Sequence, residues 1–132
     1  MIAAATGRRS CKPIVSVIDD DSAMRAALSD LLDSLGCQSR AFGSSELFLS
    51  AEAAESSDLV ITDIEMGELD GLGLLKQLGE TLAYPVPVIV ITALSDVRLE
   101  HRATAGGCFA FLRKPFDPER LIAHVRKAVA LP

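Results

Sequence analysis

The sequence predicts an α/β fold in which a doubly wound, five-stranded parallel sheet carries helices on both faces. Short aliphatic runs alternate with helical segments five times along the 132 residues. The runs are apolar at nearly every position, as is typical of strands buried on both faces of a parallel sheet. Because crossovers between parallel strands are right-handed, the intervening helices are expected to cover both faces.

The chain opens its regular structure with the strand Ile14–Ile18. A helix is predicted over 22–35, because its apolar residues recur with a period of 3.6. Asp21 or Ser22 can cap the start of this helix, and Gly36 can adopt the left-handed backbone that ends it. The predicted inward face of the helix consists of Met24, Ala27, Leu28, Leu31, Leu32 and Leu35.

A weaker strand is predicted over 37–42, since its apolar content is lower than that of the other runs. Ser44 can then cap a second helix that extends to about Ala54, with Leu47 and Phe48 facing inward. The third strand, 59–62, ends at an acidic residue.

A turn-rich loop over 67–71 leads to a third helix near 72–78. The fourth strand is Val88–Ile91, and Pro85 and Pro87 lie ahead of it, where missing N–H groups do least harm.

The fourth helix is predicted over 96–105 and is ended by Gly106 and Gly107. After the fifth strand, 109–112, the pair Asp117-Pro118 opens the last helix, since proline suits a first helical turn. The inward face of the last helix is predicted to be Leu121, Ile122, Val125, Ala128 and Val129.

The composition is that of a globular domain, with 49% hydrophobic and 23% charged residues. A net charge of −5 disfavours nucleic acid or an anionic membrane as a direct ligand. Cys11, Cys37 and Cys108 have no paired spacing, which favours a reducing compartment over a disulfide framework. No run approaches the roughly 20 apolar residues of a membrane span. We expect a cytoplasmic protein with a flexible leader, 1–12, and one domain, 13–132.

Polar residues stand at the carboxyl ends of four predicted strands. Asp19 and Asp20 follow the first strand, Asp63 the third, Thr92 the fourth and Lys114 the fifth. Ligands of open α/β sheets bind outside the carboxyl ends of the strands. We therefore expect these side chains to converge on one pocket.

Three carboxylates in one pocket repel one another by roughly 1–4 kcal/mol per pair, so a cation is expected to neutralise Asp19, Asp20 and Asp63. Oxygen ligands without Cys or His favour Mg2+, with Mn2+ as an alternative. A carboxylate such as Asp63 can act as a nucleophile and form an aspartyl phosphate. The cation, the Thr92 hydroxyl and the Lys114 ammonium can stabilise charge on the phosphoryl oxygens.

The peptide bond after Lys114 is also informative, because cis peptides occur at X-Pro bonds. A cis Lys114–Pro115 peptide would direct the ammonium over the strand ends.

Four segments together resemble the receiver domain of bacterial two-component response regulators, and FixJ-like receivers in particular. They are VSVIDDDSAMR (15–25), LVITDIEM (59–66), VITA (90–93) and FLRKPF (111–116). The resemblance covers about residues 13–130 and implies the (βα)5 flavodoxin-like receiver fold.

The resemblance implies that Asp63 accepts a phosphoryl group from a sensor histidine kinase or a phosphotransfer protein. Asp20, Asp63 and the backbone carbonyl of Glu65 would bind Mg2+ directly, and Asp19 would act through water. Lys114 would bind the phosphoryl group. Such a domain is not an enzyme in the usual sense, since it catalyses only its own phosphorylation and dephosphorylation.

The resemblance also implies a route for the signal. Thr92 and Phe111 would form a switch pair that couples the site to the face made by 96–105, the fifth strand and the last helix. Arg98, His101, Arg113 and Arg120 offer polar contacts on that face. We expect partner binding or homodimerisation there after phosphorylation.

The chain departs from the usual receiver pattern at three positions. Gly67 follows Met66 where a proline is usual, and Leu94 stands two residues past Thr92 where a polar residue is frequent. Gly73 lies inside the third predicted helix and should weaken it by about 0.5–1 kcal/mol relative to alanine. None of these changes removes a catalytic atom.

Two other functions remain open from the sequence. A pseudo-receiver would share the fold and only bind proteins. A small phosphatase of the haloacid dehalogenase type would use Asp19 as its nucleophile, because Asp19-Asp20-Asp21 imitates the Asp-x-Asp motif of that family. Its late acidic pair is missing here, since the later strands end in Thr92 and Lys114.

Overall fold

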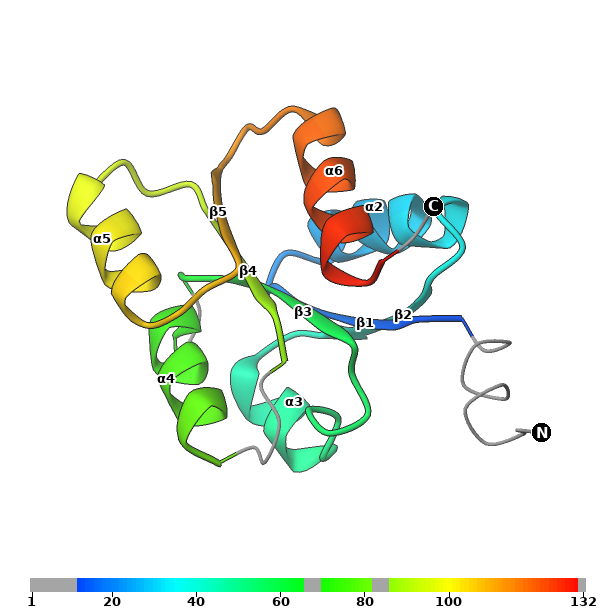
Figure 1. The fold of residues 1–132 in the computed structure, drawn as a ribbon, viewed down its shortest axis with the longest axis horizontal. Coiled ribbons are helices and arrows are strands. Elements are labelled where there is room, and N and C mark those ends of the chain that lie inside the picture. The colour runs from blue at the N-terminus through cyan, green and yellow to red at the C-terminus, as the bar shows by residue number, and fades with distance from the viewer. Residues whose placement is uncertain (1–11, 66–69, 82–85, 131–132) are drawn as a thin grey trace.

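The computed structural model describes residues 12–65, 70–81 and 86–130. Within these ranges, five parallel strands form one sheet (Figure 1). The strand order is β2-β1-β3-β4-β5, which is the flavodoxin-like doubly wound order. The strands are β1 (Ile14–Ile18), β2 (Gln38–Phe42), β3 (Leu59–Asp63), β4 (Val88–Thr92) and β5 (Ala110–Arg113). The predicted fold class is therefore confirmed.

Helices connect the strands and cover both faces of the sheet. In the described ranges they are α2 (Ser22–Ser34), α3 (Ser45–Ser50), α4 (Gly71–Thr81), α5 (Val97–Ala105) and α6 (Pro118–Ala128). In Figure 1, α2 and α6 lie on one side of the sheet, and α3, α4 and α5 lie on the other. This alternation follows from right-handed crossovers on each side of the β1–β3 pair.

The core consists of two apolar clusters, one on each face of the sheet. The first packs side chains of the sheet against Leu32 of α2 and Leu121 of α6, both fully buried. The second packs the opposite strand positions against Phe48 of α3 and Leu74 of α4. Because both faces are covered, β3 and β4 are buried along their whole length.

The helix ends follow the predicted capping signals, except that Asp96 caps α5 where the sequence analysis placed it inside the helix. Gly36 after α2 and Gly107 after α5 have φ of 87° and 88°, the left-handed region that glycine adopts without steric cost. A capping side chain accepts a hydrogen bond from a first-turn N–H at the start of α2, α3, α5 and α6; these residues are Asp21, Ser44, Asp96 and Asp117.

The prediction for the second helix is wrong in two respects. The helix ends at Ser50 rather than near Ala54, because the chain turns at Glu52, whose φ is 52°. Leu47 was expected to face inward but is 58% exposed. A helix this short presents one stripe to the sheet, and Phe48 occupies it, with its ring edge-on to Phe42 at 5.4 Å.

Other boundaries move by smaller amounts. β2 begins at Gln38 instead of Cys37, β5 begins at Ala110 instead of Phe109, and α4 is longer than the predicted 72–78. Cys37 is buried and Cys108 half-buried, both as free thiols, whereas Cys11 lies outside the described residues.

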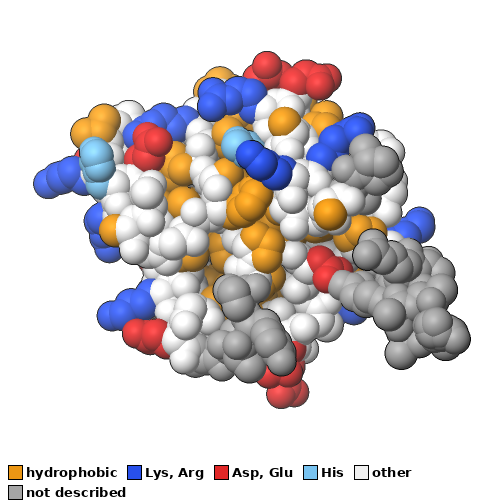
Figure 2. Space-filling model, in the orientation of Figure 1, with side chains coloured by type: hydrophobic (Ala, Val, Ile, Leu, Met, Phe, Trp, Pro, Cys, Tyr) orange, Lys and Arg blue, Asp and Glu red, His pale blue; other side chains and the backbone are white. Residues whose placement is uncertain are grey.

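The described surface carries acidic and basic side chains together (Figure 2), as expected from the composition of the chain. On the face drawn in Figure 2, acidic and basic side chains are interspersed around the rim and form no extended basic patch. In the part of the chain that the structure describes, none of the helices combines the length and the apolar character that crossing a membrane requires.

Candidate functional site

The register of the sheet brings the predicted site residues to one edge. Ile18 of β1 pairs with Thr62 of β3, so Asp19 and Asp63, the next residues, emerge side by side. Asp63 itself pairs with Ile91 of β4, and Thr92 pairs with Arg113 of β5. The residues after these pairs therefore line the carboxyl edge at the β1–β3 switch point, where doubly wound folds bind ligands.

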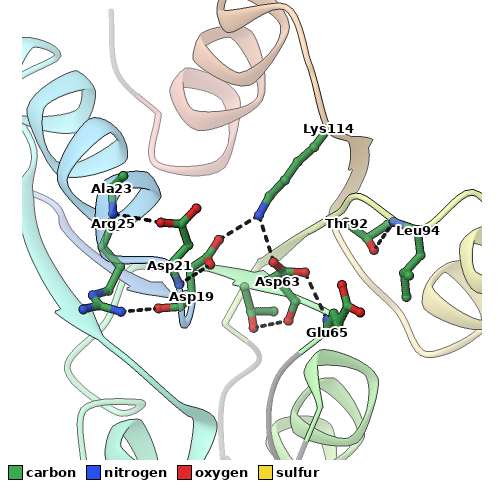
Figure 3. Close-up of polar contacts among 10 residues, drawn as sticks. Asp19, Asp21, Ala23, Arg25, Asp63, Glu65, Thr92, Leu94 and Lys114 are labelled. Atoms are coloured by element: carbon green, nitrogen blue, oxygen red, sulfur yellow. Dashed lines mark hydrogen bonds and ion pairs between the residues drawn. The ribbon is translucent and has the colours of Figure 1, made fainter.

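A lysine joins two carboxylates at this edge. The Nζ atom of Lys114 donates to Oδ2 of Asp63 at 2.8 Å and to Oδ2 of Asp19 at 3.0 Å (Figure 3). The peptide bond between Lys114 and Pro115 is cis, the form that the sequence analysis considered for directing the ammonium over the strand ends. The backbone N–H of Lys114 donates to the carbonyl of Thr92 at 2.7 Å, which ties the end of β5 to the end of β4.

Burial and hydrogen bonding act in opposite directions on Lys114. Burial lowers the pKa of its ammonium, but the hydrogen bonds with Asp63 and Asp19 outweigh this effect and raise the pKa above its usual value. The ammonium therefore stays charged at physiological pH. It offsets part of the carboxylate repulsion that the sequence predicted.

The predicted acidic cluster is present. Oxygen atoms of Asp19, Asp20 and Asp63 lie within 4.8 Å of one another. Asp19 and Asp63 are 3% and 7% exposed, whereas Asp20 is exposed. Hard carboxylate oxygens without a thiolate or imidazole fit a hard divalent cation such as Mg2+, and the exposed Asp20 leaves one side open to water.

Backbone donors orient both buried carboxylates. The N–H of Asp21 donates to Oδ1 of Asp19 at 2.9 Å, and the N–H of Glu65 donates to Oδ1 of Asp63 at 3.0 Å. Asp63 thus holds one oxygen against Glu65 and the other against Lys114. These bonds preset the direction of the Asp63 carboxylate at the open edge of the sheet.

Thr92 reaches the same edge but makes a different contact. It is fully buried, and its Oγ1 accepts a hydrogen bond from the N–H of Leu94 at 3.0 Å. Figure 3 shows this hydroxyl turned toward Leu94 and away from the group formed by Asp19, Asp63 and Lys114. The structure therefore joins three of the four predicted strand-end positions directly, and keeps the fourth beside them.

Phe111, the other predicted switch residue, is half-buried in β5. The guanidinium of Arg113 lies 5.3 Å from the centre of its ring, and Nη1 of Arg113 donates to the carbonyl of Leu94 at 2.8 Å. Arg113 thus connects Phe111 to the segment that also contacts Thr92.

Sequence reasoning assigned no role in the site to Arg25, Arg113 or Gly71. The guanidinium of Arg25 donates to the carbonyl of Asp19 at 2.6 Å. A Cβ at Gly71 would overlap the carbonyl oxygen of Asp63. The first residue of α4 therefore packs directly against the backbone of Asp63. The sequence signal for these residues is weak, because each lies against a backbone atom of another segment, and backbone atoms are the same for every residue type. Met66 and Gly67 lie outside the described residues.

Taken together, the doubly wound sheet, the acidic cluster and the lysine at the switch point define a receiver-type signalling domain. The chain belongs to the response regulator receiver domain family, whose pattern it matches over residues 15–126. It is a signalling domain of two-component response regulators and not a classical enzyme.

Sequence similarity to individual regulatory proteins supports the same family assignment. The chain is 39% identical over 115 residues to the transcriptional regulatory protein FixJ of Bradyrhizobium diazoefficiens, covering 87% of this chain and 56% of FixJ. It is 38% identical over 118 residues to the DNA-binding transcriptional regulator NtrC of Salmonella typhimurium, covering 89% of this chain and 25% of NtrC. The chain thus spans about half of FixJ and a quarter of NtrC.

Solved structures show the same fold. The crystal structure of FixJ-N superimposes with a TM-score of 0.79 at 30% identity, covering 90% of this chain and 94% of that one. The beryllofluoride-activated DrrB receiver domain gives a TM-score of 0.81 at 28% identity, covering 90% and 98%.

Proposed function

We propose that this domain accepts a phosphoryl group on Asp63 from the phosphohistidine of a sensor histidine kinase or a phosphotransfer protein. The observation that carries the proposal is the contact of Lys114 with Asp63 inside a cluster of three carboxylates. This arrangement pairs a nucleophile with a fixed positive charge. Membership of the receiver family supports the same function.

In the proposed reaction an oxygen of Asp63 attacks phosphorus, and an acyl phosphate bond forms. The P–N bond to the donor histidine breaks, and the imidazole nitrogen leaves with the electron pair and takes a proton. Lys114 already lies within hydrogen-bonding distance of Asp63 Oδ2. Its ammonium can follow the charge as it moves from the carboxylate to the phosphoryl oxygens.

We propose Mg2+, or Mn2+ in its place, as the resident cation. Asp20, Asp63 and the backbone carbonyl of Glu65 would hold it directly, and Asp19 would act through water. A bound Mg2+ would supply positive charge for the phosphoryl oxygens. The oxygen-only donor set and the exposure of Asp20 support this assignment.

The phosphoryl donor needs a route to Asp63, and a mostly apolar groove is lined in part by Lys114, whose ammonium contacts Asp63. The groove has a volume of about 390 Å3 and adjoins Lys114. Its walls include Met24, Ala27 and Leu31 of α2 and Pro115 and Phe116 after β5. We assign this groove to the protein that carries the phosphohistidine, since a protein bound there would lie beside Lys114, which contacts the proposed acceptor.

Phosphorylation would then change the face made by α5, β5 and α6. The phosphoryl group adds about two negative charges and strong acceptor oxygens. The Thr92 oxygen accepts from Leu94, which leaves its O–H hydrogen available to donate to such an oxygen. A move of Thr92 toward the phosphoryl group would open space for Phe111 and loosen the Arg113 contacts.

We propose that this face then binds a partner or a second copy of the domain. Arg98 and Arg120 are exposed there, and Arg98 pairs with Asp96 at 2.8 Å. The net charge of −5 supports a domain that does not itself contact nucleic acid or an anionic membrane. We also propose a cytoplasmic location for the domain.

Mass spectrometry after incubation with Mg2+ and acetyl phosphate tests the function directly. We expect one added phosphoryl group, located on Asp63, and none in the Asp63→Asn variant. No adduct on the wild type would indicate a pseudo-receiver. The phosphatase alternative, with turnover through Asp19, is not favoured, because the chain belongs to the receiver family and its later strands end in Thr92 and Lys114 rather than in an acidic pair.

A further inference from the structure

Arg25 forms hydrogen bonds with the turn that carries Asp19 and Asp20, two of the three residues of the acidic cluster. This turn, Asp19–Asp21, leads from β1 into α2. The Nη1 atom of Arg25 donates to the carbonyl oxygen of Asp19 at 2.6 Å, and the backbone N–H of Arg25 donates to the carbonyl of Asp21 at 3.0 Å. Both ends of the half-buried Arg25 thus bind the same turn.

The turn is also held from the side of β2. The N–H of Asp19 donates to the carbonyl of Phe42 at 3.1 Å. A Cβ at Gly43 would lie 3.5 Å from Nη1 of Arg25, so the guanidinium rests against the backbone that follows β2. Arg25 therefore joins three segments, namely the turn, α2 and the end of β2.

Arg25 and Lys114 approach Asp19 in different ways. Lys114 donates to a carboxylate oxygen of Asp19, whereas Arg25 donates to the backbone carbonyl of the same residue, from the other side in Figure 3. Lys114 occupies an oxygen that a cation would need. Arg25 leaves the carboxylate oxygens of Asp19 to other partners and fixes only the backbone that aims them.

We propose that Arg25 is a positioning residue for the cation site. Its hydrogen bond fixes the backbone of Asp19 and therefore the direction of the Asp19 and Asp20 side chains. The inference rests on the proposed Mg2+ site but goes beyond it, since Arg25 touches neither the cation nor the phosphoryl group. Residues that orient metal ligands commonly change metal affinity by about 10–100-fold when they are mutated.

The direction in which Mg2+ affinity changes when Arg25 is replaced distinguishes a positioning role from a purely electrostatic one. Arg25 carries a positive charge near a site for a cation, so electrostatics alone predicts that removing this charge strengthens Mg2+ binding. Positioning predicts the opposite, because a loosened turn must be ordered again when the cation binds.

The test compares Arg25→Met with Arg40→Met. Arg40 is a matched control, since it is also half-buried and also makes one guanidinium hydrogen bond, to Oγ of Ser56 at 2.8 Å. Isothermal titration calorimetry should show Mg2+ binding about tenfold weaker in Arg25→Met, and changed by less than about twofold in Arg40→Met. The Mg2+ concentration that half-saturates labelling by acetyl phosphate should rise in parallel, while the rate at saturating Mg2+ stays similar.

Arg25→Lys gives a second measurement in case Arg25→Met fails to fold. It keeps the charge and loses the guanidinium geometry, so positioning predicts weaker Mg2+ binding here too. Equal or tighter binding in either folded variant would overturn the role of Arg25 and leave the proposed function intact. A wild-type protein that binds no Mg2+ would overturn both.

Discussion

The ammonium of Lys114 lies 2.8 Å from Oδ2 of Asp63, although 51 residues separate the two along the chain. The same ammonium reaches Asp19 at 3.0 Å. The carboxylate cluster is therefore partly neutralised by the protein itself. A cation or phosphoryl group bound at the proposed site would share these oxygens with Lys114, and its binding would thereby be connected to the end of β5.

Asp63→Asn and Asp63→Ala should abolish phosphorylation by a kinase or by acetyl phosphate. Asparagine keeps the shape of the side chain but loses the nucleophilic carboxylate and one negative charge. Intact-mass spectrometry should find no adduct on either variant, with thermal unfolding as a control for folding. Full labelling of either variant at another aspartate would contradict the assignment.

Asp20→Ala should weaken Mg2+ binding strongly and stabilise the protein slightly in the absence of Mg2+. The variant loses a proposed ligand and also one member of a repulsive cluster. Because Asp20 is exposed, the gain should be at most about 1 kcal/mol. Urea unfolding with and without Mg2+ measures both effects, and a variant that is less stable without Mg2+ would refute the repulsion argument.

Lys114→Met should destabilise the protein by roughly 2–4 kcal/mol, because two nearly buried carboxylates lose their ion pair. Mg2+ should restore more stability to this variant than to the wild type, since it would neutralise the same carboxylates. Urea unfolding of both proteins across Mg2+ concentrations tests this. Equal stabilisation of the two by Mg2+ would show that the cation binds elsewhere.

The contribution of Lys114 should also depend on pH. Its pKa is raised above the usual 10.5 in the folded protein, so its stabilising effect is complete below about pH 10.5. The effect is lost as the pH rises through the raised pKa. The difference in stability between wild type and Lys114→Met should therefore be flat from about pH 8 to 10 and shrink only at higher pH.

Thr92→Ala should weaken the response to beryllofluoride, which substitutes for the phosphoryl group. The variant lacks the hydroxyl that we expect to turn from Leu94 toward the phosphoryl oxygens. Self-association and the side-chain NMR signals of Phe111 should change less than in the wild type. Thr92→Ser keeps the hydroxyl and serves as the control. An undiminished response in Thr92→Ala would exclude the route from Thr92 to Phe111.

Gly71→Ala and Gly79→Ala should have opposite effects although both lie in α4. A Cβ at Gly71 would overlap the carbonyl of Asp63 and come within 2.9 Å of Cα of Ile64, whereas a Cβ at Gly79 meets nothing within 4 Å. Gly79→Ala should stabilise the protein by about 0.5–1 kcal/mol. Gly71→Ala should destabilise it and slow labelling of Asp63.

Combining the two glycine substitutions tests whether the labelling defect reflects a displaced strand end or lower stability. Slow labelling that persists when Gly79→Ala restores stability would indicate displacement of β3. Normal labelling in that background would show that Gly71 matters for stability alone.

The sequence by itself determined the fold class, the five strands and the residues at the strand ends. These features follow from local patterns, namely aliphatic runs, a 3.6-residue period and capping residues, which act within a few positions along the chain. Asp19, Asp63 and Lys114 could be predicted to meet, because parallel strands bring their carboxyl ends to one edge.

Only the tertiary structure decided the contacts that make this edge a site. It turned the Thr92 hydroxyl toward Leu94, placed Arg25 on the carbonyl of Asp19, and left Leu47 exposed while Phe48 filled the core. These outcomes depend on which of several side chains and rotamers fits its surroundings in the folded chain, even where the partner is only two residues away, as for Thr92 and Leu94. That competition is settled by packing and hydrogen bonding in three dimensions, so no local pattern along the chain encodes it.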